Sequence, residues 1–343
     1  MNESRLQDIL LRSTRARALV IGDFVLSRRL LIDPARVEYS EETGLHAHQV
    51  VAVDMMPGAA GKVAAALRAF GVAVATLGVI GDDGEGYELR RNLRKRGIDE
   101  RPMIIAADRY TPTSIQPLIV GKTSVPYEQE RLDIRSRTPM AFSTATALVE
   151  RLRALATQVH AVIIVDYVPE EECGVVTSRL RVEIANLSLR HQDVWFLATS
   201  RHRIGLFKHV IIVPCARECV RAVYADDSSN PPLALVGQAA EQLRRRTGKP
   251  VIVTLGARGM LVVHDRGMTH ALPIQIPGPI NLTGTSETAV AAVTAALCAG
   301  ATLDEAVELG NLATAAAMRQ TETSSVASPE QIIAVWRTYC RDE

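Results

Sequence analysis

The chain lacks the features that mark disulfide-bonded, membrane-spanning and nucleic-acid-binding proteins. Its five cysteines are an odd number without a Cys-x-x-Cys pair, which disfavours a disulfide framework or zinc site and fits a reducing cytoplasm. No apolar run of about 18 residues is free of charges and helix breakers, so we expect no membrane span. The net charge is +1, from 39 basic and 38 acidic residues, without the basic excess typical of a nucleic-acid binder.

Aromatic residues are also scarce, at 4%, whereas 47% of the 343 residues are hydrophobic and Ala and Val are prominent. This composition favours a globular core of packed helices and argues against disorder. Short Val- and Ile-rich runs alternate with Ala- and Leu-rich stretches of helical length, as at 161–165, 209–213 and 250–254. Such uninterrupted apolar strands predict an α/β fold, with a mostly parallel sheet covered by helices on both faces.

Two segments interrupt this alternation, at residues 29–56 and 101–136. They are richer in β-branched and polar residues, with Pro, Gly and Thr, and we expect them to form a small β-lid inserted in the first half. Residues 1–16 are polar and Arg-rich, which indicates an exposed helix or tail and leaves 17–340 for the main domain. In a sheet of this kind, ligands bind beyond the carboxyl ends of the strands.

The most informative stretch is Asn281-Leu-Thr-Gly-Thr-Ser-Glu287, a glycine-containing turn that leads directly into a small-residue helix over 286–299. Exposed N–H groups and the helix dipole make such a helix start suitable for an anion. Glu287 lies in the first helical turn, where a carboxylate beside a bound phosphate can take a proton from a substrate hydroxyl. The stretch therefore indicates chemistry on a phosphate group.

This stretch resembles the Asp-x-Thr-Gly-Ala-Gly-Asp signature of the ribokinase-like (PfkB) carbohydrate kinases. Further segments resemble that family in the same order: Gly22-Asp23, Pro57–Leu67, Gly81–Gly86, Val213–Glu218 and Thr254–Gly259. Through Arg131-Leu-Asp133 the chain is most similar to the heptose-kinase-like branch. The resemblance extends from about residue 16 to 335 and implies a ribokinase-like fold, ATP and Mg²⁺ as cofactors, and a β-lid that often forms a homodimer interface.

The resemblance also implies a role for individual residues. For the chemistry, the resemblance implies that Glu287 is the base and that the anion hole is formed by Gly284, Thr285 and Ser286. Those implied to bind the nucleotide are Thr254, Gly256, Gly259 and Glu218, with Glu218 acting on Mg²⁺ through water. Those implied to contact a sugar-like acceptor are Asp23, Ser27, Gly58, Lys62 and Asp166.

Some of these residues have other interpretations. Asp23 and Asp166 each end a strand, where an Asp can instead cap a turn or the next helix. Lys62 replaces a family Asn, and could either hold a phosphorylated or acidic ligand or fill the sugar pocket. The loop 254–259 could be a tight turn between two strands.

The chain departs from the family pattern mainly at site positions: Ser27, Lys62, Thr199, Cys215, Asn281, Ser286 and Glu287. Ser286 replaces a glycine and restricts the backbone, and Glu287 is one methylene longer than the family Asp. A displacement of about 1 Å can cost on the order of 10²-fold in rate. These departures favour a pseudokinase that binds a ligand or a protein partner. The alternative is an active ATP-dependent kinase of a hydroxyl on a sugar or sugar phosphate.

Overall fold

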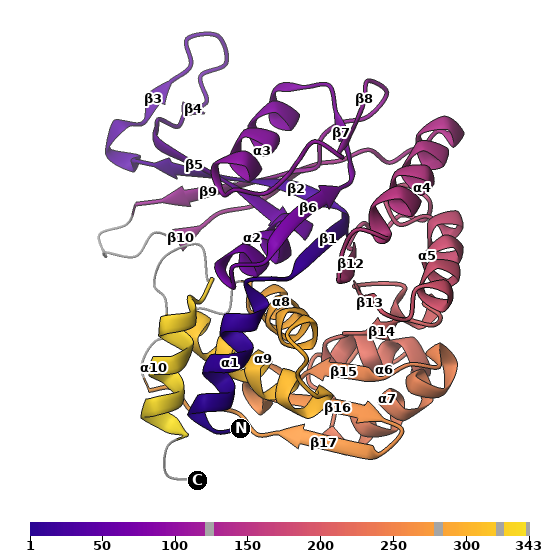
Figure 1. Cartoon of the computed structure of the whole chain (residues 1–343). Coiled ribbons are helices and arrows are strands. Elements are labelled where there is room, and N and C mark those ends of the chain that lie inside the picture. The colour runs from indigo at the N-terminus through magenta and orange to yellow at the C-terminus, as the bar shows by residue number, and fades with distance from the viewer. Residues whose placement is uncertain (121–126, 278–283, 320–325, 341–343) are drawn as a thin grey trace.

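The computed structural model describes residues 1–120, 127–277, 284–319 and 326–340, and every structural statement below concerns these residues. An eight-stranded sheet forms the centre of the molecule (Figure 1). In spatial order its strands are β17 (Gly267–Ala271), β16 (Met260–His264), β15 (Val251–Thr254), β14 (Ile211–Ile212), β13 (Trp195–Ser200), β12 (Ala161–Asp166), β1 (Arg17–Gly22) and β6 (Ala73–Leu77). The strands from β15 to β6 are parallel and β16 and β17 are antiparallel, which confirms the predicted mostly parallel sheet.

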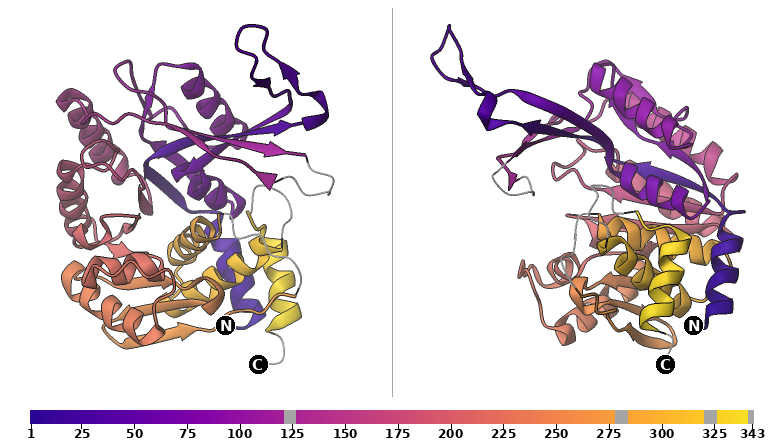
Figure 2. Two further views of the ribbon diagram at one scale, coloured as in Figure 1. Left: turned by 180° about the vertical axis from the view of Figure 1, so that it is seen from behind. Right: turned by 90° about the vertical axis from the view of Figure 1, so that its left-hand side faces the viewer.

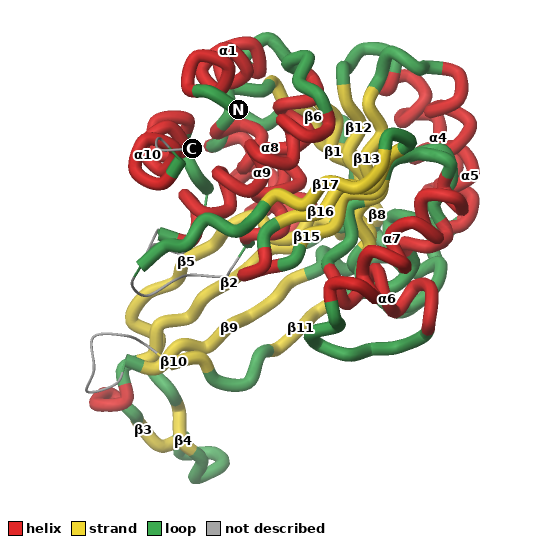
Figure 3. Tube along the Cα trace, turned by 90° about the horizontal axis from the view of Figure 1, so that it is seen from below, coloured by secondary structure: helices red, strands yellow, loops and turns green. Residues whose placement is uncertain are grey.

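Helices cover both faces of this sheet, as Figure 3 shows in a view from below. One face carries α1 (Glu3–Ser13), α2 (Ala60–Ala69), α8 (Thr285–Cys298), α9 (Leu303–Met318) and α10 (Pro329–Tyr339). The other carries α4 (Phe142–Ala156), α5 (Ser178–Arg190), α6 (Ala216–Tyr224) and α7 (Leu233–Thr247). Successive strand residues point to opposite faces, so Val20 lies in the first core and Leu19 and Ile21 in the second.

A second sheet forms the lid, which extends away from the main body in the right-hand view of Figure 2. Its strands are β10 (Tyr127–Glu128), β9 (Thr113–Ile119), β2 (Phe24–Ile32) and β5 (Val50–Ala59), with β11 (Leu132–Ile134) also paired to β9. The small hairpin of β3 (Glu38–Tyr39) and β4 (His46–Ala47) lies at its tip. The strand pair β7 (Val79–Gly81) and β8 (Ile104–Ala106) lies outside the lid sheet, and α3 (Gly84–Lys95) packs against β2 and β5.

The first residues are not an exposed tail. They form α1, whose Leu6 and Ile9 are fully buried against the helices of the first core. The apolar residues recur at helical spacing and face the core. The charged residues that suggested an exposed segment lie on the opposite, solvent-facing side of the helix. Arg5 of α1 also pairs with Glu305 of α9, with Nε and Oε1 2.8 Å apart.

This ion pair predicts a pH-dependent contribution to stability. The hydrogen bonds from Arg5 lower the pKa of Glu305 from 4.5 to about 2. Because the pKa is lower in the folded state, the stabilisation is present above the unfolded pKa and is lost as the pH falls toward the folded one. We expect Glu305→Gln, which can keep the cap at Thr302, to lower the free energy of unfolding at about pH 7 by about 1 kcal/mol. Urea unfolding should show this difference shrinking at about pH 3, whereas a constant difference would contradict the assignment.

Candidate functional site

Several side chains gather where the parallel strands end. Asp23, Tyr167 and Arg201 come directly after β1, β12 and β13, and Thr254 is the last residue of β15. Helix α8 begins at the same edge, with Gly284 as its N-cap in a left-handed conformation. The helix is rich in Ala and buried from Thr288 to Leu297, so small side chains let it pack deep in the fold with its N-terminus at the strand ends.

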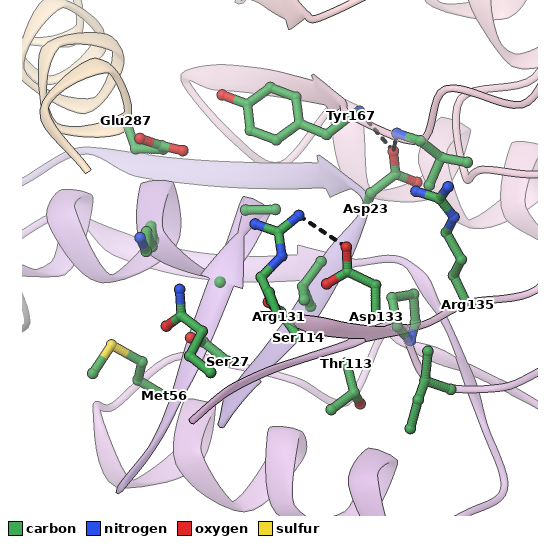
Figure 4. Close-up of a pocket in the computed structure, with 18 of the residues that line it drawn as sticks. Asp23, Ser27, Met56, Thr113, Ser114, Arg131, Asp133, Arg135, Tyr167 and Glu287 are labelled. Atoms are coloured by element: carbon green, nitrogen blue, oxygen red, sulfur yellow. Dashed lines mark hydrogen bonds and ion pairs between the residues drawn. The ribbon is translucent and has the colours of Figure 1, made fainter. Parts of the chain in front are cut away.

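Two adjoining cavities open at this edge. The first, here called the lid cavity, has a volume of about 220 Å³ and lies between the lid strands and the sheet. Its walls include Ser27, Arg29, Met56, Gly58 and Ser114 from the lid, and Asp23, Tyr167 and Glu287 from the main domain. Figure 4 shows Glu287 and Tyr167 approaching from the side opposite Ser27, Met56 and Ser114.

The second cavity, here called the sheet-edge cavity, measures about 390 Å³ and extends toward β14 and β15. Its walls include Thr199, Cys215, Glu218, Thr254, Gly284, Thr285 and Ser286. Six residues line both cavities and form what we call the junction: Lys62, Gln116, Arg131, Tyr167, Arg201 and Glu287.

The junction brings together the predicted base, the predicted anion hole and Lys62. Glu287 is partly buried in the first turn of α8, beside Gly284, Thr285 and Ser286. The Lys62 side chain lies against the same helix start, because a Cβ placed on Gly284 would be 4.0 Å from its Nζ. Among the described residues, no carboxylate lies within ion-pair distance of this ammonium. The arrangement places a carboxylate, a cation and a helix N-terminus around one point.

Tyr167 and Arg201 complete the main-domain side of the junction. The Arg201 guanidinium lies 4.4 Å from the centre of the Tyr167 ring, which fixes its position by a cation–π contact. Burial, together with the charges of Glu287 and Glu218, raises the pKa of the Tyr167 phenol well above its usual value. Tyr167 therefore stays protonated and can act as a hydrogen-bond donor at neutral pH.

Asp23 lines the lid cavity, but its carboxylate is largely occupied. It accepts hydrogen bonds from the backbone N–H groups of Tyr167, Val168 and Val175, at 2.8, 2.9 and 2.8 Å. Burial raises its pKa, helped by the nearby charge of Asp166 and opposed by these three donors. Asp23 therefore fixes the loop that follows β12, and this loop carries Tyr167 into the junction.

Asp166 does not reach either cavity, contrary to its predicted contact with substrate. It is fully buried and pairs with Arg203, with Oδ1 and Nη2 2.6 Å apart, and accepts a hydrogen bond from Ser200 Oγ at 2.7 Å. Nor does it cap a helix. A buried carboxylate needs such partners because an unpaired charge in the interior is costly. Arg203 also donates to the carbonyls of Val168 and Pro169, so the pair supports the same loop as Asp23.

Glu218, predicted to act on Mg²⁺ through water, lines the sheet-edge cavity, and one of its carboxylate oxygens is hydrogen-bonded locally. Its Oε2 accepts the backbone N–H of Cys215 at 2.8 Å in the capping box of α6. Burial raises the pKa of Glu218 and raises that of the Cys215 thiol to about 11. The carboxylate therefore has reduced acceptor capacity for the water shell of a hydrated Mg²⁺. Within the described ranges no cluster of three or more His, Cys, Asp or Glu could hold a metal ion. Asn281 lies outside the described residues.

Of the predicted nucleotide loop, Thr254 lines the sheet-edge cavity, whereas Gly256 and Gly259 do not. Gly256 is the first residue of a short 3-10 helix, Gly256–Arg258, that lies between β15 and β16, and Gly259 directly follows this helix. Gly259 has a φ of +85°, and a Cβ there would be 2.1 Å from the Ala271 carbonyl oxygen. The neighbouring strand comes so close that a side chain at position 259 would clash with it. This favours the interpretation of the loop as a tight turn between two strands.

The residues that the sequence reasoning missed are mainly cations. The lid cavity is lined by Arg29, Lys62, Arg131, Arg135 and Arg201, against the carboxylates of Asp23, Asp133 and Glu287. Only Lys62 was predicted. The segment of Arg131 resembles a family motif, but nothing in the sequence spacing showed that Arg131 and Arg201 meet at one junction. No helix among the described residues is both long and apolar enough to cross a lipid bilayer.

Taken together, the mostly parallel sheet, the inserted β-lid and the helix that starts beside a carboxylate at the strand ends define a ribokinase-like class of α/β fold. The chain belongs to the pfkB family of carbohydrate kinases, whose family model matches residues 20–331. It is 25% identical over 340 residues to the bifunctional protein HldE of Trichlorobacter lovleyi and 27% identical over 331 residues to that of Hyphomonas neptunium. These alignments cover 98% and 95% of this chain, but 66% and 65% of the relatives, so the chain spans about two thirds of their length.

Solved structures show the same fold. Phosphofructokinase-2 from Escherichia coli, in complex with potassium, superposes with a TM-score of 0.71 at 17% identity, over 95% of this chain and all of that one. Ribokinase from Arabidopsis thaliana, complexed with ribose and ATP, gives a TM-score of 0.67 at 13% identity, over 93% and 98% of the two chains. At these identities the likeness establishes a ribokinase-like fold, as the sequence predicted.

Proposed function

We propose that this chain is an active kinase that transfers the terminal phosphoryl group of ATP to a hydroxyl of a phosphorylated sugar. The observation that carries the proposal is the junction, where Glu287, Lys62 and the start of α8 meet between two cavities. An acceptor in the lid cavity and a triphosphate in the sheet-edge cavity would approach each other at this point. Phosphoryl transfer depends mainly on such positioning and on stabilisation of charge.

In the proposed reaction, the acceptor oxygen forms a bond to the γ-phosphorus while the bond from that phosphorus to the bridging oxygen of ADP breaks. The hydroxyl proton passes to the Glu287 carboxylate. Lys62 and the first N–H groups of α8 stabilise the charge on the phosphoryl oxygens. Magnesium, when bound, would neutralise further phosphate charge, and Oε1 of Glu218 would contact its hydration shell.

The charge of the lid cavity supports a phosphorylated acceptor. Two of its three carboxylates are already engaged, Asp23 by backbone N–H groups and Asp133 by Arg131 at 2.8 Å. Arg29 is partly buried, its Nε lies 3.5 Å from Gln116 Oε1, and it stands opposite Asp54 in the pairing of β2 with β5. Arg131 and Arg135 are likewise paired, with Asp133 and Glu170, so Arg29 is the lid-cavity cation that we expect to bind the phosphate of a sugar monophosphate, a contact that an uncharged sugar cannot make.

A second candidate is a pseudokinase that binds a ligand without catalysis. The occupied carboxylate of Glu218 and the thiol of Cys215 at the same wall favour it, since both weaken the usual magnesium surroundings. Both candidates bind phosphate groups, and they differ in turnover.

The lid also supports a proposal about assembly. Val50, Val51 and Val53 of β5 have side chains that are 43%, 44% and 47% exposed, and we propose that this strand forms a homodimer interface. None of the five cysteines, all of which lie within the described residues, is joined in a disulfide, in keeping with the proposed cytoplasmic location.

Steady-state kinetics would test the acceptor class. We expect transfer to hexose or heptose monophosphates and at least about ten-fold lower kcat/KM for the same sugars without phosphate, because one charge-assisted contact is worth about 1.5–3 kcal/mol. Arg29→Gln should raise KM for the phosphorylated acceptor by about ten- to hundred-fold with little change in kcat. Equal kcat/KM for a sugar and its monophosphate would contradict the proposal.

A further inference from the structure

Positive charge dominates the junction between the two cavities. Lys62, Arg131 and Arg201 line both cavities, and Glu287 is the only carboxylate among the described residues that does so. The proposed catalysis requires Glu287 to accept a proton, so it is not available as a metal ligand. This leaves three cations facing the place where phosphate groups would meet.

The same wall offers a magnesium ion few oxygen ligands. Apart from Glu287, the described lining of the sheet-edge cavity contains one carboxylate, Glu218, and its Oε2 is held by the Cys215 N–H at 2.8 Å. The neighbouring wall positions are Thr199, Cys215 and Thr254, which carry no charge. Magnesium is held in proteins by one or two carboxylates together with the substrate phosphates, and the described part of this wall offers one, Glu218, which is already hydrogen-bonded in the capping box of α6.

Two of the three cations are oriented by a contact, and the third lies beside the start of α8. Lys62 lies on α2 with its Nζ beside the N-cap of α8. Arg201 lies over the Tyr167 ring at 4.4 Å. Arg131 comes from the lid and is oriented by Asp133, with its Nη2 2.8 Å from Oδ2, as Figure 4 shows. The cations come from α2, from the segment after β13 and from the lid, so they surround the junction from three directions.

We propose that Lys62, Arg131 and Arg201 compensate the charge of a bound triphosphate in place of a protein-held magnesium ion, so that this chain binds the free nucleotide without metal. Guanidinium groups pair with phosphate oxygens in a fixed fork geometry, and an ammonium acts as a compact point charge. Because Arg131 belongs to the lid, the closed lid would contribute to nucleotide binding as well as to acceptor binding. The inference rests on the proposed function for the identity of the phosphate ligand.

Isothermal titration of the full chain with ATP would test this inference, once with excess Mg²⁺ and once with EDTA. We expect saturable binding in both buffers, with dissociation constants that agree to within about three-fold. Lys62→Met and Arg201→Met should each weaken binding in EDTA by about ten- to hundred-fold. The matched control is Lys208→Met, which removes an exposed lysine that lines neither cavity and should leave binding unchanged.

Inorganic triphosphate in the same titration would separate the two parts of the ligand. Binding of triphosphate in EDTA, also weakened by Lys62→Met, would support recognition of the phosphate chain itself. Loss of ATP binding in EDTA with normal binding in Mg²⁺ would overturn the inference and leave the kinase proposal standing. Binding of ATP in EDTA by a protein that transfers no phosphoryl group to any sugar monophosphate when Mg²⁺ is present would support the inference and contradict the kinase proposal. No ATP binding in either buffer would overturn the inference.

Discussion

Glu287→Gln is expected to lower kcat by about 10²- to 10⁴-fold, the range that a positioned general base contributes. The amide keeps the size and hydrogen-bonding reach of the side chain but cannot accept the acceptor proton. Glu287 lies in the first turn of α8 and lines both cavities, so the change removes the only junction carboxylate among the described residues. Initial-rate kinetics with a sugar monophosphate would measure the effect. Titration with ATP should show nucleotide binding that is retained or stronger, because the variant carries one less negative charge beside the phosphates.

The conservative change at the same position gives the control. Glu287→Asp combined with Ser286→Gly restores the residue types of the family signature at the helix start. If the chain is an active kinase, this variant should keep or raise the rate. A Glu287→Gln protein that turns over at the wild-type rate would show that another group takes the proton, and would remove Glu287 from the proposed mechanism.

The second large effect is expected from Arg203→Met, which leaves Asp166 as a fully buried carboxylate without its cation. Removing one partner of a buried ion pair costs about 3–5 kcal/mol. In this chain the exposed fractions of the two side chains are 8% for Arg203 and 0% for Asp166. The loop after β12 also loses the bonds that Arg203 donates to the carbonyls of Val168 and Pro169. We therefore expect a lower free energy of unfolding in urea together with weaker ligand binding at Tyr167.

An exposed arginine provides the comparison for this variant. Arg179 donates to Thr146 Oγ1 at 2.8 Å on the surface of α5, and Arg179→Met should change stability by less than about 1 kcal/mol. If Arg203→Met were no more destabilising than Arg179→Met, the buried pair would not support the loop. The double variant Arg203→Met with Asp166→Asn should recover part of the loss, since it removes the unpaired charge.

The layered fold was predictable because its signals are local. Val and Ile runs such as Ala161–Asp166 are buried on both faces, and only a parallel sheet between helices demands this pattern. The short edge strand Gly267–Ala271 is mostly exposed and carries no apolar run, so it was missed. Helix α1 was expected to be an exposed helix or tail because charged and polar residues are interspersed among its apolar ones, although Leu6 and Ile9 are spaced to face the core.

The candidate site was predictable only in part. Gly284 to Glu287 could be found because a glycine turn before a small-residue helix is a continuous motif. Whether Asp166 faces a ligand or an arginine depends on Arg203, which is 37 residues away in sequence. The cation cluster was hidden for the same reason, since Lys62, Arg131 and Arg201 come from three separate segments. The family pattern showed Lys62 as a departure, and its place beside Gly284 is what gives that departure a role.

The most direct test of the central claim is phosphorus NMR of the full chain mixed with ATP, Mg²⁺ and a panel of hexose and heptose monophosphates. We expect a new phosphomonoester resonance that appears in step with ADP for at least one acceptor and that is absent with Glu287→Gln. Unchanged ATP across the panel, from a protein that binds ATP by calorimetry, would contradict it and show that this family member binds its ligand without catalysis.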